Sequence, residues 1–170
     1  PVMSRGLGDV YKRQVVVSAM GGETNRLVDL AKAFGDDPDK REFDALVSTG
    51  ETVSSALLTM ALHSKGVKAK SFSASQISMR TTSSYSKAKI LDVDAKKILD
   101  VVENDTIPII TGFQGVTEGG DVTTLGRGGS DTTAVAIAAQ IAATRCDIFT
   151  DVDGIFTTDP GVVPNAKKLD

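Results

Sequence analysis

Apolar residues follow two alternating patterns along the chain, one typical of strands and one typical of helices. Residues 14–19 (QVVVSA) form a short β-branched run that leads into Gly21 and Gly22, as a buried parallel strand does. The next apolar residues have the i, i+3, i+4, i+7 spacing of an amphipathic helix, and they are Leu27, Leu30, Ala31 and Phe34. The beginning of the chain therefore predicts a strand, a glycine turn and a helix.

The same alternation continues to residue 150. Further helices are predicted from Glu51 to a stop at Gly66, over residues 94–102 and over residues 131–143. Strands are predicted at residues 69–73, 106–111 and 146–150, with a hairpin at 116–125, a polar turn at 35–40, and a loop or short ribbon at 75–87. Alternating strands and helices predict an α/β fold with a mostly parallel sheet sandwiched by helices.

Composition favours one soluble globular domain. The 170 residues are 41% hydrophobic and 24% charged, with a net charge of −3, so we expect neither a nucleic-acid nor a membrane partner. No uninterrupted apolar run approaches the roughly 20 residues of a membrane helix, and no signal peptide is visible. The single Cys146 excludes an internal disulfide and a cysteine zinc cluster, and the single His63 argues against a histidine metal site. We expect a cytoplasmic protein with no metal-ligating residues of its own, and Cys146 buried in its strand.

The two ends of the chain look different from its middle. Residues 1–14 (PVMSRGLGDVYKRQ) show no strand or helix period and resemble a non-native junction. At the other end the chain stops at Asp170 without a capping or closing signal. We therefore expect a non-native head over residues 1–14, followed by a partial domain over residues 15–170.

The most unusual polar segment is TTLGRGGSD, residues 123–131, directly before a predicted helix. Glycines let the backbone approach a ligand, and a helix N-terminus favours an anion. Arg127 adds a planar fork suited to a carboxylate or phosphate, and Asp131 is placed either to cap the helix or to hold an ammonium group. A glycine-rich turn with an aspartate cap is the alternative. The segment is not a Walker A loop, because the chain has no Gly-Lys pair, and it lacks the third glycine of a dinucleotide fingerprint.

Two further segments combine charges with glycine. Residues 150–160 (TDVDGIFTTDP) follow a predicted strand, but an EF-hand would need a glycine at Phe156, so a capped loop is the simpler interpretation. Residues 48–51 (STGE) end in Glu51, which in isolation reads as a helix-start glutamate that interacts with the helix dipole.

Taken together, five segments resemble the aspartate kinases of the amino-acid kinase superfamily, and they are VVVSAMGGETNRLVDLA, STGE, GFQG, TTLGRGGSDTTAVA and TDVDGIFTTDP. Sister kinases of glutamate, acetylglutamate, carbamate and UMP share the fold but are not expected to carry both of the last two. The resemblance implies a three-layer, amino-acid-kinase-like domain that is incomplete here. It also implies transfer of a phosphoryl group from ATP, with Mg²⁺, to the side-chain carboxylate of L-aspartate, which gives 4-phospho-L-aspartate in the first step of lysine, threonine and methionine biosynthesis.

The resemblance also implies roles for individual residues. Arg127 would clamp the α-carboxylate of aspartate, Glu51 and Asp131 would receive its α-ammonium group, and the same pocket would be lined by Gly128, Gly129 and Ser130. On the nucleotide side, the resemblance assigns Thr150, Asp151, Phe156, Thr157, Thr158, Asp159 and Pro160. The attacking carboxylate is already ionised at neutral pH, so no general base is expected.

The chain also departs from the family pattern. It lacks the Lys-Phe-Gly-Gly-Thr-Ser segment whose lysine binds the transferring phosphate, a second phosphate-binding lysine, and the regulatory domains through which the parent would form homo- or hetero-oligomers. Phe156 stands where tyrosine is usual, and Gly161 where arginine is usual. We therefore expect the fragment itself to be inactive. Two alternatives stay open, namely a sister kinase of the acetylglutamate or glutamate type and a non-catalytic binding relative on the same fold.

Overall fold

A parallel sheet of three strands lies at the centre of the fold in the computed structural model, which describes residues 13–150, 157, 163 and 165–168. Its strands are β1 (Val15–Val17), β5 (Ile107–Thr111) and β2 (Ala69–Phe72), in the order β1-β5-β2. Val17 pairs with Thr111, so β1 and β5 end at the same level. The predicted strands at residues 14–19, 69–73 and 106–111 are confirmed.

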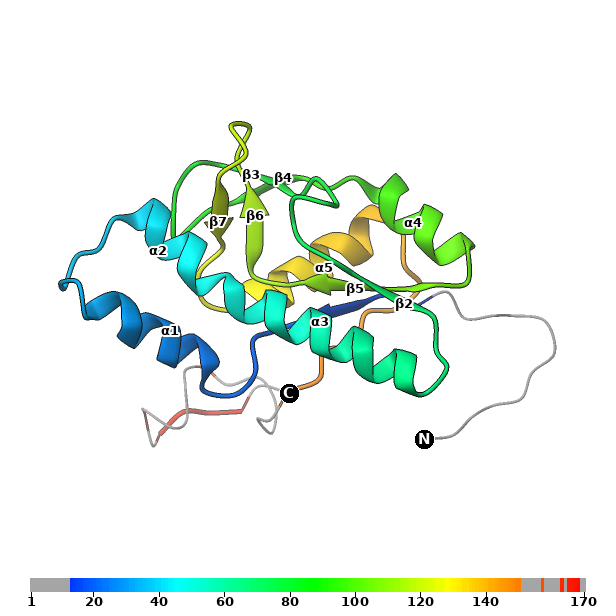
Figure 1. The fold of residues 1–170 in the computed structure, drawn as a ribbon, viewed down its shortest axis with the longest axis horizontal. Coiled ribbons are helices and arrows are strands. Elements are labelled where there is room, and N and C mark those ends of the chain that lie inside the picture. The colour runs from blue at the N-terminus through cyan, green and yellow to red at the C-terminus, as the bar shows by residue number, and fades with distance from the viewer. Residues whose placement is uncertain (1–12, 151–156, 158–162, 164, 169–170) are drawn as a thin grey trace.

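Helices cover both faces of this sheet, which confirms the predicted three-layer arrangement (Figure 1). The long helix α3 (Thr49–Ser64) packs on one face, and α4 (Ala95–Glu103) and α5 (Gly129–Gln140) pack on the other. Ile110 of β5 lies in one core cluster with Ile98 of α4 and Ile137 of α5, each at most 1% exposed. Its neighbour Ile109 is equally buried, and successive strand residues point to opposite faces, so Ile109 is directed toward α3.

A second, mixed sheet lies beside the first. Its order is β4-β3-β6-β7, and its strands are β4 (Ile90–Asp92), β3 (Arg80–Thr81), β6 (Gln114–Val116) and β7 (Val122–Thr124). The antiparallel pair of β6 and β7 confirms the hairpin predicted at residues 116–125. The strand β3 lies within the segment predicted as a loop or short ribbon, but the four-stranded sheet as a whole was not predicted.

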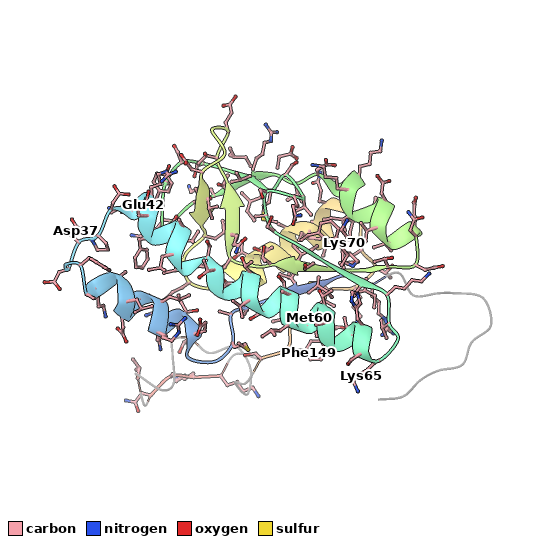
Figure 2. The ribbon with its side chains drawn as sticks, in the orientation of Figure 1. Asp37, Glu42, Met60, Lys65, Lys70 and Phe149 are labelled. Carbon is pink, nitrogen blue, oxygen red and sulfur yellow. The ribbon has the colours of Figure 1, made fainter. Side chains whose placement is uncertain are left out.

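Helix α1 (Glu23–Lys32) and the helices α3, α4 and α5 confirm the helical predictions. Helix α2 (Lys40–Val47) is an addition. Its N-cap, Asp39, accepts a hydrogen bond of 3.1 Å from the backbone N–H of Glu42. Glu42, a residue of the first turn, is labelled in Figure 2. An Asp three residues before a Glu, followed by apolar Phe43 and Val47, is a helix-start pattern that the sequence does contain.

Helices α2 and α3 follow one another so closely that Lys40–Ser64 forms one helical stretch. By length and composition alone this stretch is apolar enough to cross a membrane. The core helix of a soluble protein passes the same test, and α3 packs against β2 and β5 of the central sheet. The stretch also buries two carboxylates, those of Asp44 and Glu51. Packing within the domain therefore accounts for part of its apolar character, while Val53, Leu57 and Met60 of α3 are exposed.

The predicted strand at residues 146–150 is wrong. The structure gives this segment no regular structure and no strand partner among the described residues, and β1 pairs only with β5 there. Phe149, labelled in Figure 2, is 94% exposed, and Cys146 is exposed rather than buried as expected. A β-branched and aromatic run shows that a segment is able to form a strand, but a strand also requires a hydrogen-bonding neighbour, which local sequence does not specify.

Candidate functional site

Several of the predicted site residues lie where β1 and β5 end. The two strands are neighbours, and the Gly112 N–H directly after β5 donates to the Val17 carbonyl at the end of β1, at 2.9 Å. Ligands of open α/β sheets collect at the carboxyl ends of the strands. Two helix N-termini, those of α3 and α5, come close to this edge, one at each strand.

The first turn of α3 lies against the residues that follow β1. A Cβ on Gly50 would come within 2.9 Å of the Ala19 Cβ, so only glycine allows this approach. The next residue, Glu51, is 3% exposed, and its Oε1 accepts a hydrogen bond from the Ala19 N–H at 3.2 Å. Its Oε2 is buried and has no hydrogen-bond partner among the described residues. Glu51 thus lies in the first turn of α3, as the sequence predicts, and the structure adds a buried acceptor without a partner among the described residues.

The ionisation of Glu51 reflects this environment. Burial raises the pKa of its carboxyl group to about 7, while hydrogen bonds from the backbone N–H groups of Glu51 and Ala19 oppose the rise. A buried carboxyl without a cation beside it favours the neutral form. A ligand cation placed at Oε2 would reverse this preference, so the site is suited to receive positive charge.

The N-terminus of α5 lies against the residues that follow β5. A Cβ on Gly112 would come within 2.7 Å of the Ser130 Cβ and Oγ, and a Cβ on Gly129 would come within 2.7 Å of the Phe113 ring. The helix begins after Gly128, whose φ of 69° is a left-handed conformation that glycine adopts readily. The structure thus brings Gly129 and Ser130 to the same edge as Glu51.

The loop that carries Arg127 is held by its backbone. The Leu125 N–H donates to the Phe113 carbonyl at 3.0 Å, and the Gly129 N–H donates to the Gly126 carbonyl at 3.1 Å. Arg127 itself is exposed, and no hydrogen bond or ion pair ties its guanidinium to another described residue. Its side chain is therefore available to a ligand.

Asp131 lies in the first turn of α5 and is exposed. The alternative that it caps the helix is wrong, because the N-cap is Gly128 and no side chain caps this end. Its carboxylate is close in sequence to Arg127 and near the positive end of the helix dipole.

Two buried polar side chains near the site were missed by sequence reasoning. Gln114, which follows Gly112 and Phe113, accepts a hydrogen bond from the Thr111 hydroxyl at 2.9 Å, and it donates to the Ser48 carbonyl and to the Thr52 hydroxyl. It thereby ties the end of β5 to the start of α3. The second, Asp44 of α2, is fully buried. The only signal in the sequence is a charged residue between Phe43 and Val47 in an otherwise apolar run.

The nucleotide-side residues are described only in part. Asp151, Phe156, Thr158, Asp159 and Pro160 lie outside the described residues. Thr150 and Thr157 are both exposed. Thr157 pairs with Lys167, through a backbone hydrogen bond of 2.8 Å and a second bond of 3.0 Å from the Lys167 N–H to the Thr157 hydroxyl. Within the described part of the chain, no three His, Cys, Asp or Glu side chains are grouped to hold a metal ion.

Comparison with known proteins gives consistent relatives. The family model described as the amino acid kinase family matches residues 5–170. An aspartate kinase of Pseudomonas putida is 56% identical over 156 residues, which are 92% of this chain and 38% of that protein.

Solved structures agree with these relatives. An aspartate kinase from Synechocystis has a TM-score of 0.68 and 44% identity, covering 90% of this chain and 25% of its own. Aspartokinase III of E. coli, in complex with aspartate and ADP, has a TM-score of 0.66 and 36% identity, and the match covers 86% of this chain and 33% of that chain. The chain thus spans less than half the length of the relatives that it matches.

Proposed function

The chain belongs to the amino acid kinase family, and from this premise we propose that the protein of which it forms part is an aspartate kinase. The proposed reaction is transfer of the γ-phosphoryl group of ATP to the side-chain carboxylate of L-aspartate. The observation that carries the proposal is the presence of two opposite charges at one edge of the sheet, the buried Glu51 carboxylate and the Arg127 guanidinium, which has no partner among the described residues. Relatives named aspartate kinase, at 54–56% identity, support it.

An α-amino acid substrate presents an ammonium group and a carboxylate on one carbon atom. The open Oε2 of Glu51 is suited to accept from the ammonium group, and an ammonium there would stabilise the ionised form of Glu51. The planar fork of Arg127 is suited to two parallel hydrogen bonds to the α-carboxylate. Asp131 would be a second acceptor for the ammonium group, and Gly128, Gly129 and Ser130 would line the pocket.

The chemistry asks little of the side chains beyond placement and charge. The β-carboxylate of aspartate is ionised at neutral pH and attacks without a general base. When bound, ATP supplies the phosphoryl group and Mg²⁺ neutralises its phosphate oxygens. The residues of this chain would hold aspartate in line with that group, which is catalysis by positioning. That Thr150, Asp151 and residues 156–160 bind the nucleotide remains part of the proposal.

The test uses the full-length protein that contains this chain. Formation of aspartyl phosphate is trapped as the hydroxamate, with ATP, Mg²⁺ and aspartate varied in turn. Loss of a buried charge-assisted contact is worth roughly 2–5 kcal/mol, so Arg127→Ala should raise the aspartate KM by about 30-fold or more and leave the ATP KM nearly unchanged. Arg26→Ala, which removes an exposed arginine from α1, is the matched control. An Arg127→Ala enzyme with unaltered aspartate KM and kcat would contradict the assignment.

The remaining expectations are also proposals. The 170-residue chain alone should form negligible aspartyl phosphate, because both phosphate-binding lysines expected of the family are missing from it; turnover comparable to the full-length protein would refute this. We further expect the full-length protein to be cytoplasmic and to form oligomers through regulatory domains.

A further inference from the structure

Asp44 of α2 is a fully buried carboxylate that accepts four hydrogen bonds. Its Oδ2 accepts from the backbone N–H groups of Ser86, at 2.8 Å, and Thr124, at 2.7 Å. Its Oδ1 accepts from the hydroxyl groups of the same two residues, at 2.9 and 3.0 Å. All four donors are neutral, so the carboxylate joins three separate segments without forming an ion pair with any of these partners.

Both partners lead directly to the loop that carries Arg127. Thr124 is the last residue of β7, three positions before Arg127, and its carbonyl accepts from the Ala88 N–H at 2.9 Å. The Ser86 carbonyl packs on Gly126, because a Cβ added there would lie 3.2 Å from it. Asp44 thus holds the strand residue that leads into the loop, and also Ser86, which packs against Gly126 within it.

Ser86 also adopts an uncommon backbone conformation. Its φ of 63° lies in the left-handed region, which a serine rarely adopts without support from its surroundings. The two hydrogen bonds to Asp44 supply that support. Without them Ser86 is free to relax, and its carbonyl would move away from Gly126.

We propose that Asp44 is a positioning residue for Arg127, and that it sets the affinity for the substrate α-carboxylate through the four hydrogen bonds to Ser86 and Thr124. The inference rests on the proposed role of Arg127. The Arg127 guanidinium has no partner among the residues that the structure describes, so the loop backbone sets the Cα position from which the side chain reaches its ligand. A small displacement of that backbone moves the guanidinium out of reach of its ligand.

The four hydrogen bonds of Asp44 make Asp44→Asn an informative substitution. In Asp44→Asn the amide oxygen can accept from both N–H groups. The NH₂ group can donate to both hydroxyl groups, each of which then acts as an acceptor instead of a donor. All four contacts are then retained without the charge. Asp44→Ala removes all four and leaves the N–H groups of the buried Thr124 and the half-buried Ser86 without their acceptor.

The experiment measures steady-state kinetics of the full-length protein. Asp44→Ala should raise the aspartate KM at least tenfold with the ATP KM within twofold of wild type, whereas Asp44→Asn should stay within twofold for both. Ile98→Ala, a core change in α4, is the control for general loss of stability and should leave the aspartate KM unchanged. Thr124→Val removes only one of the four hydrogen bonds and should give a smaller rise in the aspartate KM. It replaces Asp44→Ala as the test variant if Asp44→Ala does not fold.

Hydrogen exchange provides a readout that does not depend on activity. Asp44→Ala should speed amide exchange at Ser86 and residues 124–129, and neither Asp44→Asn nor Ile98→Ala should do so. A folded Asp44→Ala protein with wild-type aspartate KM and wild-type exchange would overturn the proposal, and so would an Asp44→Asn protein as impaired as Asp44→Ala. If the wild-type protein transferred no phosphoryl group to aspartate, the proposed function would fail, and exchange would still decide whether Asp44 fixes the loop.

Discussion

Replacing Glu51 with glutamine should remove most of the pH dependence of stability between pH 5 and 8. The folded-state pKa of Glu51 is about 7, above the ordinary value of 4.5, so over this interval the folded chain binds a proton that the unfolded chain has lost. Stability rises with pH only where the unfolded state binds more protons than the folded state. Here the folded state binds more protons, so stability falls as pH rises. The contribution of Glu51 is therefore fully present below about pH 4.5 and is lost as pH rises to about 7.

The magnitude follows from the same two values. A change from 4.5 to about 7 corresponds to at most about 3.5 kcal/mol, at about 1.4 kcal/mol for each pH unit. Water that reaches the open Oε2 would reduce this figure. Glutamine keeps an oxygen for the Ala19 N–H, and its NH₂ group, without a partner, costs roughly 1–3 kcal/mol at every pH. The part of this change below pH 5 falls outside the measured interval, so the stability of the variant relative to wild type should increase from pH 5 to pH 8 by up to about 2.5 kcal/mol.

The assay is urea unfolding of the 170-residue chain, followed by far-UV circular dichroism because the chain has no tryptophan. Both proteins carry His63→Gln, so that neither contains a histidine and the comparison concerns Glu51. Free energies of unfolding are compared at several pH values from 5 to 8. Two curves that run parallel across this range would refute the reasoning, because Glu51 would then titrate alike in the folded and unfolded chains.

Two further substitutions test the packing around the site. Gly112→Ala places a Cβ 2.7 Å from the Ser130 side chain, so it should cost about 1–3 kcal/mol in urea unfolding, whereas Gly21→Ala, with open space around it, should stay within about 0.5 kcal/mol. Equal effects of these two changes would contradict the close approach of α5. Gln114→Ala removes the hydrogen bonds of Gln114 to Thr111, Ser48 and Thr52 and should cost about 1–3 kcal/mol, and an unchanged urea midpoint would show that these hydrogen bonds contribute nothing.

The parts of the fold that the sequence predicts are those with a local signal. Strands β1 and β5 lie in continuous apolar runs, and helices α1 and α3 have apolar residues at helical spacing, so their positions could be read directly. The strands β4, β3, β6 and β7 have two or three residues each and do not lie in such runs. The predicted strand at residues 146–150 fails for the complementary reason, since its composition is suitable but no described strand pairs with it.

The candidate site divides in the same way. Glu51 and Arg127 could be selected because glycine, charge and a helix start coincide in a few neighbouring residues. Asp44 could not be selected, because its hydrogen-bond partners lie 42 and 80 positions away in the chain. Nor could Gln114, whose hydrogen bonds to Ser48 and Thr52 span 66 and 62 positions. A buried polar residue is recognised by its partners, and these are fixed only when the tertiary structure brings distant segments together.

The contrast between Asp44 and Glu51 argues that the second carboxylate serves a ligand. Both are buried on neighbouring helices, at 0% and 3% exposure. Every described contact of Asp44 stabilises the fold, and both its oxygens are satisfied, as is usual for buried polar groups. Glu51 keeps one oxygen without a partner among the described residues, and burial opposes its ionisation, so at neutral pH it weakens the fold. A glutamate that only helped α3 to begin would stabilise the helix equally well from an exposed position. Its burial with an open oxygen, at the strand ends beside the Arg127 loop, is better explained by a cation that the folded protein is built to receive.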